Sequence, residues 1–333
     1  MPKLFKYILF FIIFLLIPST VRFDTFIQKK PFDINLFFKI QQTNPEYVFI
    51  GNSMLNTRID IEHLNKLSNK KSFMFDFSGS LSAEWYLMVK NFVLKLEKKP
   101  KIIFIFFRDQ NLTFADSNYE INKLMRQTLW HKKKKEYKLE EIIFSNRDLE
   151  VEIKTYLEKI YPIIQFRGKI DDELSIFLLE LVNKIFGVGL KRDVINQRFD
   201  FNNLIIDKNT NNDNDKGKTL ITKKKDFDDE VNLSFLPEII QIAKNLEIQI
   251  NLIRVQDTAP ALPYYKKHNA GEKIYLNKLS KYCSEIDVCN LIDFTGHPLI
   301  TTEMYSYKSH IKKNYMKKYT EIFFNELLLK NLL

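Results

Sequence analysis

The sequence predicts an α/β protein of three layers, in which helices cover both faces of a parallel sheet of about five strands. Two observations carry this prediction. Short apolar runs alternate with amphipathic stretches along much of the chain, and the run at 102–107 is apolar throughout, as in a strand that is buried on both faces. The chain has 333 residues and is 45% hydrophobic, which suits one domain with insertions.

The expected strands are short apolar runs that end at glycine or polar residues. They lie at 47–50, 72–76, 102–107, 248–255 and 288–292. The expected helices carry apolar residues at helical spacing and lie at 60–67, 82–96, 236–245 and 299–332. Asp60 is the expected N-cap of the first of these helices.

The middle of the chain interrupts this alternation. We therefore expect an α/β domain over 25–333 that begins with a polar connector at 25–45 and carries an insertion at about 112–235. The insertion contains two helical patterns, at 149–163 and 171–187, and a low-complexity stretch at 209–218 that reads as a solvated loop.

The first 24 residues are predicted to be a membrane anchor. Lys3 and Lys6 precede an uncharged run at 7–21 that is rich in Ile, Leu and Phe. A spanning helix needs about 20 residues, and Lys6 can snorkel to lengthen the run. The positive flank predicts that the remaining chain is exported to the extracytoplasmic, periplasmic side. A cleaved signal peptide and a buried core helix are the alternatives.

Charge and cysteine content limit the other function classes. The net charge of +10 admits a nucleic-acid partner, but the lysines are spread along the chain without a nucleic-acid motif, so we expect none. Cys283 and Cys289 are too far apart for a CxxC metal or redox site. They could form one local disulfide in an oxidising compartment or remain two thiols.

Polar segments follow four of the expected strands, and ligands of open parallel sheets bind at these carboxyl ends. Three of the eight glycines (Gly51, Gly79 and Gly296) fall in these segments, where glycine permits tight turns. The segments are Gly51-Asn52-Ser53, Ser78-Gly79-Ser80, Arg108-Asp109-Gln110-Asn111 and Asp293-Phe294-Thr295-Gly296-His297-Pro298.

These segments resemble the sequence blocks of the SGNH, or GDSL-like, hydrolases. Phe49-Ile50-Gly51-Asn52-Ser53 resembles the first block, Gly79 the glycine block, and Asp293 with His297-Pro298 the last block. The resemblance implies a flavodoxin-like sheet and a serine esterase or O-acyltransferase. The branch it is most similar to is the membrane-anchored bacterial one, which resembles polysaccharide O-acetyltransferases.

The resemblance assigns a role to each matching residue. Ser53 would be the nucleophile, His297 its base and Asp293 the acid that orients the base. The oxyanion donors would be the backbone N–H groups of Ser53 and Gly79 and the amide of Asn111. Further substrate contacts would come from Asn52, Arg108, Asp109 and Gln110.

Two positions differ from the family's pattern. Three residues rather than two separate Asp293 from His297, so a Ser–His pair without an acid is an alternative. The third block lacks the glycine of G-x-N-D, so Arg108 could pair with Asp109 or bind an anionic substrate group. The remaining histidines show no metal-ligand spacing and are expected at surface or packing positions. They are His63, His131, His268 and His310.

The expected function is therefore transfer or removal of an acyl group on a cell-envelope glycan, without a cofactor or metal. The expected partners are an envelope polysaccharide or other acylated glycan, the membrane through the N-terminal helix, and a membrane acyl-donor protein. The alternative is a non-catalytic envelope protein that uses the same fold to bind polysaccharide or to support assembly. A nucleic-acid binder is the third class, and the predicted anchor argues against it.

Overall fold

The computed structural model describes residues 32–108, 111–114, 126, 128–129, 136–145, 227–256, 269–306 and 310–333. The predicted anchor at 1–24, the helices at 149–163 and 171–187 and the loop at 209–218 lie outside these residues. Within the described ranges, no helix combines the length and the hydropathy that crossing a bilayer requires.

The predicted parallel five-stranded sheet is confirmed. Its strands are β1 (Tyr47–Gly51), β2 (Ser72–Asp76), β3 (Ile102–Phe107), β4 (Gln249–Arg254) and β5 (Cys289–Asp293). All neighbouring pairs are parallel, in the order β2-β1-β3-β4-β5. This order is the flavodoxin-like one, and it reverses direction between β1 and β3.

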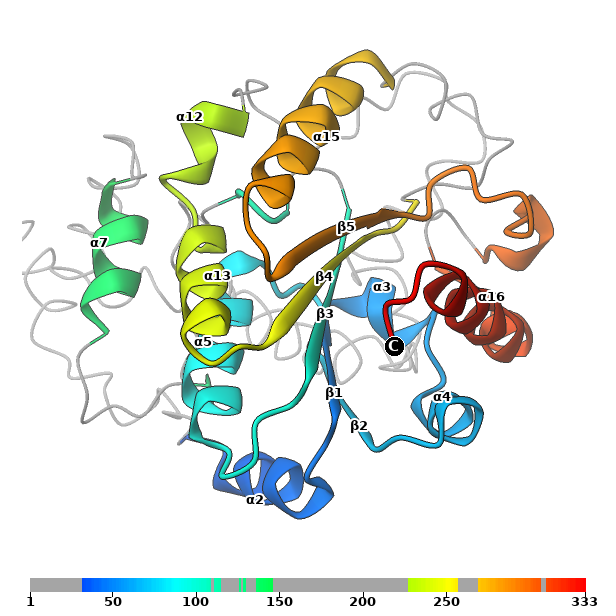
Figure 1. Ribbon diagram of the computed structural model, residues 1–333, viewed down its shortest axis with the longest axis horizontal. Coiled ribbons are helices and arrows are strands. Elements are labelled where there is room, and N and C mark those ends of the chain that lie inside the picture. Colours follow the sequence, from blue (N-terminus) through cyan, green and yellow to red (C-terminus); the bar gives the residue numbers. More distant parts are fainter. Residues whose placement is uncertain are drawn as a thin grey trace, which may run out of the picture. The chain divides into compact units, whose positions relative to one another are not determined.

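Helices cover both faces of the sheet, as the view in Figure 1 shows. One face carries α5 (Ser82–Asn91), α13 (Leu236–Asn245) and α15 (Asn269–Ser284). The other face carries α3 (Ser53–Asn56), α4 (Ile61–Ser68) and α16 (Met316–Leu329). Along β1, Val48 and Ile50 pack in the first core and Tyr47 and Phe49 in the second, which is the period of two expected of a strand.

Several elements differ from their predictions. The expected connector at 25–45 contains the helix α2 (Ile34–Thr43), capped by Asp33, and α15 was not expected. The expected helix at 299–332 is helical at Thr302–Met304 and from Lys313 to Leu329. Between these helices, residues 304–306 pair with residues 310–312 in the antiparallel direction, and we call these two paired segments the hairpin. Two short helices inside the predicted insertion, α7 (Tyr137–Ser145) and α12 (Phe227–Val231), place apolar residues in the first core.

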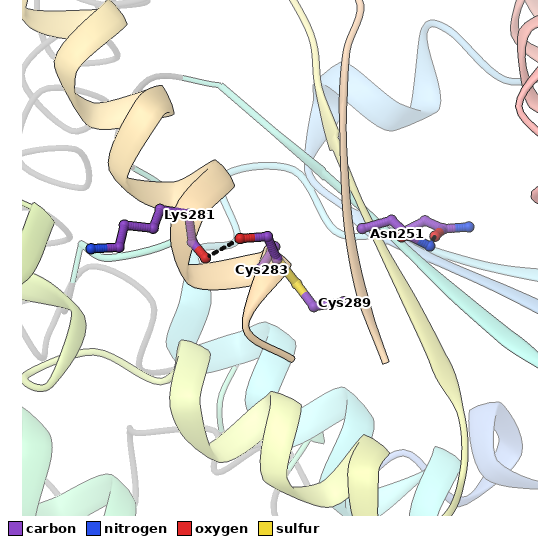
Figure 2. The surroundings of a disulfide bond; sticks show 6 residues. Asn251, Lys281, Cys283 and Cys289 are labelled. Carbon is purple, nitrogen blue, oxygen red and sulfur yellow. Dashed lines mark hydrogen bonds between the residues drawn. A yellow bond between two sulfur atoms is a disulfide. The ribbon is translucent and has the colours of Figure 1, made fainter. Parts of the chain in front are cut away.

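A disulfide joins Cys283 to Cys289. Figure 2 shows the bond linking the last turn of α15 to the start of β5, beside the hydrogen bond from Ser284 Oγ to the carbonyl oxygen of Lys281. The bond therefore lies at the amino end of β5, whereas the polar strand-end segments lie at the carboxyl ends.

Candidate functional site

Ser53 is positioned by the tight connection between β1 and α3. Asn52 caps α3, because its Oδ1 atom accepts a hydrogen bond from the Met54 N–H at 3.0 Å. Gly51 lets the helix pack close to the strand, since a Cβ atom there would lie 2.8 Å from the Cβ atom of Leu55. Ser53 is the first residue of α3, so its N–H has no acceptor within the helix.

The turn that contains Gly79 is tied to this connection. Ser80 is fully buried, and its Oγ atom donates to the Gly51 carbonyl at 3.0 Å and accepts from Trp85 Nε1 at 2.9 Å. The Asn52 amide also reaches the Ser80 carbonyl, at 3.5 Å. The β1–α3 connection that carries Ser53 and the turn that contains Gly79 are therefore held together by buried hydrogen bonds.

Gly79 itself has φ +78°, and a Cβ atom there would meet no atom within 4 Å. The residue is exposed, and its left-handed backbone conformation is one that glycine adopts readily. Asn111 is half-buried in the turn after β3, and its N–H donates to the Arg108 carbonyl at 3.1 Å. Asp109 and Gln110 lie outside the described residues.

His310, and not His297, lies beside Ser53. Its Nε2 atom is 3.1 Å from the Ser53 Oγ atom, within hydrogen-bond reach. His310 was expected at a surface or packing position, and the structure places its ring half-buried against the serine. Its position comes from the hairpin of residues 304–306 and 310–312, in which Tyr305 pairs with Ile311 and Ser306 N–H donates to the His310 carbonyl at 2.7 Å.

The predicted base His297 has other partners. Its Nε2 atom faces the Glu326 carboxylate at 3.7 Å, and its Nδ1 atom accepts from the Leu299 N–H at 3.3 Å. Its ring stacks on Phe294, with centroids 5.7 Å apart. The geometry corrects the prediction, since the turn after β5 directs this ring toward α16 and away from a bond with Ser53.

The predicted acid Asp293 is also occupied elsewhere. It forms an ion pair with Arg254 at 3.2 Å and accepts hydrogen bonds from the N–H and hydroxyl of Thr295, at 2.8 Å and 2.6 Å. This arrangement closes the turn after β5, so Asp293 does not orient the histidine that contacts Ser53. Residues 307–309, which precede His310, are Tyr, Lys and Ser and supply no carboxylate.

The environment of His310 favours the neutral imidazole. Burial lowers the pKa of His310, and the positive charges of Arg58 and Arg108 lower this pKa further. The predicted substrate contact Arg108, directly after β3, is thus close enough to act on the histidine. A neutral imidazole can accept the proton of the Ser53 hydroxyl at physiological pH.

Metal chemistry receives no support from the described part of the chain. Within those ranges, no group of three or more His, Cys, Asp or Glu side chains is arranged to hold a metal ion. The arrangement present is instead a serine with a neighbouring histidine at the carboxyl end of β1, which suits nucleophilic acyl transfer.

His310 was not predicted because its signal in the sequence is weak. Two histidines follow the last strand, His297 and His310, and the first stands near an aspartate in the order that the family pattern requires. The alternative of a Ser–His pair without an acid fits the described residues, but with His310 in place of His297. In the described residues, the pairing of Tyr305 with Ile311 brings His310 to Ser53 and so distinguishes the two histidines.

Comparisons with known proteins give little further guidance. No protein-family model matches this sequence, and no curated protein matches it. A solved structure from Streptococcus pneumonia, provisionally assigned as a platelet activating factor, is similar at 10% sequence identity and a TM-score of 0.33. The match covers 88% of this chain and 92% of that one. A TM-score this low bears on neither the activity nor the substrate of this chain.

Proposed function

We propose that this chain is a serine esterase or O-acyltransferase whose nucleophile is Ser53 and whose base is His310. The observation that carries the proposal is the 3.1 Å contact between Ser53 Oγ and His310 Nε2 at the carboxyl end of β1. An isolated hydroxyl is a poor nucleophile, and a neutral imidazole at this distance can take its proton as it attacks.

The proposed reaction has two halves. Ser53 Oγ attacks the acyl carbonyl carbon while its proton passes to His310 Nε2, and the carbonyl electrons move to oxygen. When this tetrahedral intermediate collapses, the ester C–O bond breaks and the departing alcohol takes the proton from His310. In the second half, water or a sugar hydroxyl attacks the carbonyl carbon of the acyl-Ser53 ester and gives its proton to His310. The second tetrahedral intermediate then collapses, the bond between Ser53 Oγ and the acyl carbon breaks, and Ser53 takes the proton back from His310 as the acid or the new ester leaves.

The oxyanion of both halves would be stabilised by backbone donors. The Ser53 N–H at the start of α3 is one candidate, and the exposed turn at Gly79 is the second. Asn111 in the turn after β3 is the proposed side-chain donor, with Asn52 held in place as the cap of α3.

We further propose that the protein acts outside the cytoplasm on an acylated envelope glycan. Two features support export: the predicted anchor at 1–24, and the disulfide between Cys283 and Cys289, since such bonds persist in oxidising compartments. An acyl-donor protein of the membrane is a proposed partner if the reaction is a transfer.

The test uses the full chain with p-nitrophenyl acetate and a fluorophosphonate that labels activated serines. Wild type should hydrolyse the ester and become labelled at Ser53, and Ser53→Ala should lose both. Ser284→Ala is a matched control, because its hydroxyl donates to the Lys281 carbonyl at 2.7 Å, near the amino end of β5 and at the opposite end of the sheet from Ser53. Equal labelling of wild type and Ser53→Ala, or no labelling of wild type, would leave the non-catalytic binding module as the better account.

A further inference from the structure

Arg58 is a fully buried cation that contacts both the helix of Ser53 and the hairpin of His310. It follows α3, the helix that begins with Ser53, and precedes α4. A buried guanidinium is costly unless its surroundings compensate it, so its position calls for a structural or functional reason.

The guanidinium contacts the nucleophile side through the main chain. Its NH1 nitrogen donates to the Met54 carbonyl at 3.1 Å, and its NH2 nitrogen donates to the Gln256 carbonyl at 2.8 Å. Met54 follows Ser53 in α3, and Gln256 lies just beyond β4. Arg58 therefore fixes the helix of the nucleophile against the carboxyl end of the sheet.

The same side chain also contacts the base side. Its guanidinium carbon lies 6.0 Å from the ring centroid of Tyr305 and 5.7 Å from that of Tyr319, which are cation–π distances. Tyr305 pairs with Ile311, the neighbour of His310, and Tyr319 belongs to α16. The hairpin that carries the base thus rests against the cation that holds the helix of the nucleophile.

The charge of Arg58 acts on His310 as well, and it favours the neutral ring. The other charged groups on the neighbouring elements are these. Arg108 adds a second positive charge, and Lys312 directs its ammonium to the Glu303 carbonyl at 2.8 Å. After β5, Arg254 forms an ion pair with Asp293, and the His297 ring faces the Glu326 carboxylate.

We propose that Arg58 is a positioning residue for the proposed acyl-transfer site, because it joins the helix of Ser53 to the hairpin of His310. This inference rests on the proposed function for its kinetic consequences. The effect of the Arg58 charge, which lowers the pKa of His310, can be measured without turnover.

Three variants of the full chain test it: Arg58→Met, Arg58→Lys and the control Arg254→Met, which removes another buried arginine. Arg58→Met should lower kcat for p-nitrophenyl acetate by at least about tenfold, or ~1.4 kcal/mol of the barrier, and move the acid limb of the pH profile to higher pH. Arg58→Lys should lower kcat but leave the acid limb near that of wild type. Lysine keeps the positive charge but cannot donate to the Met54 and Gln256 carbonyls with two separate nitrogens as the guanidinium does.

NMR titration of the His310 ring gives the second readout. Arg58→Met should raise the midpoint, and Arg254→Met should leave it unchanged. If Arg58→Met does not fold, the proposal stands or falls on Arg58→Lys. Wild-type kcat in Arg58→Lys would overturn the positioning role, and an unchanged His310 midpoint in folded Arg58→Met would overturn the electrostatic role. Failure of Ser53 labelling in wild type would refute the proposed function. The NMR titration would still test the effect of the Arg58 charge on His310 by itself.

Discussion

The Nε2 atom of His310 lies 3.1 Å from the Oγ atom of Ser53, although 257 positions separate the two residues in the chain. The contact depends on two local structures. The β1–α3 connection presents the serine at the end of the sheet, and the pairing of Tyr305 with Ile311 places the histidine beside it. The chemistry proposed for this chain depends on that contact.

The pH dependence of activity should reflect the cationic surroundings of His310. Burial and the charges of Arg58 and Arg108 lower its pKa, so the base should remain available below the ordinary histidine value of about 6.5. We expect the acid limb of kcat/KM for p-nitrophenyl acetate to have its midpoint below that value. A midpoint at or above it would contradict this account of the histidine's environment.

The same residue should affect stability in a defined direction. Because the folded state holds the pKa of His310 below its unfolded value, the unfolded chain binds more protons as the pH falls through about 6.5. The contribution of His310 to the free energy of unfolding is therefore present above this pH and is lost as the pH falls toward the folded-state pKa. The free energy of unfolding, measured by urea denaturation at several pH values, should fall more steeply with decreasing pH in wild type than in His310→Gln. The same pH dependence in both proteins would argue against this contribution.

The buried hydroxyl of Ser80 should matter for turnover more than for substrate binding. Ser80→Ala leaves the Gly51 carbonyl and Trp85 Nε1 without this partner, at a cost of about 1–3 kcal/mol in stability. Because Gly51 precedes the nucleophile turn, kcat should fall while KM changes little. Ser234→Ala is the matched control, since its buried hydroxyl donates to the Val231 carbonyl at 2.7 Å, near α13. An equal loss of kcat in both variants would show a general effect of destabilisation.

Reduction of the disulfide should affect stability and spare activity. The bond closes a short loop of sequence separation 6, for which chain entropy predicts a contribution of about 2 kcal/mol. A Cys283→Ser, Cys289→Ser double variant should therefore unfold at lower temperature and should not respond to reductant. Its kcat should equal that of wild type, because the bond lies at the end of β5 opposite to the site. A large loss of kcat at a temperature where the variant is folded would contradict this placement.

The sheet could be predicted from the sequence because its strands are buried. Runs such as 102–107 are apolar throughout, and polar residues or glycine mark their ends. The helix α15 was missed because half of its residues are polar, and the part of it whose burial is described buries a narrow stripe at Tyr275, Leu279 and Cys283. That four-residue spacing was its only signal.

The candidate site was predictable only in part. Ser53 could be identified because a glycine and a helix cap directly follow a buried strand. The histidine could not, because the nearby aspartate that favoured His297 forms an ion pair with Arg254. The residue that reaches Ser53 does so through a hairpin whose pairing, between Tyr305 and Ile311, leaves no pattern in the sequence.

The most direct test of the central claim compares two histidines by the rate at which a fluorophosphonate labels Ser53. We predict that His310→Gln reduces this rate by about a hundredfold or more, the lower range for loss of a general base. His297→Gln should be labelled at nearly the wild-type rate, since its ring faces Glu326. Both variants should be confirmed as folded by circular dichroism. Rapid labelling of His310→Gln together with loss of labelling in His297→Gln would contradict the account.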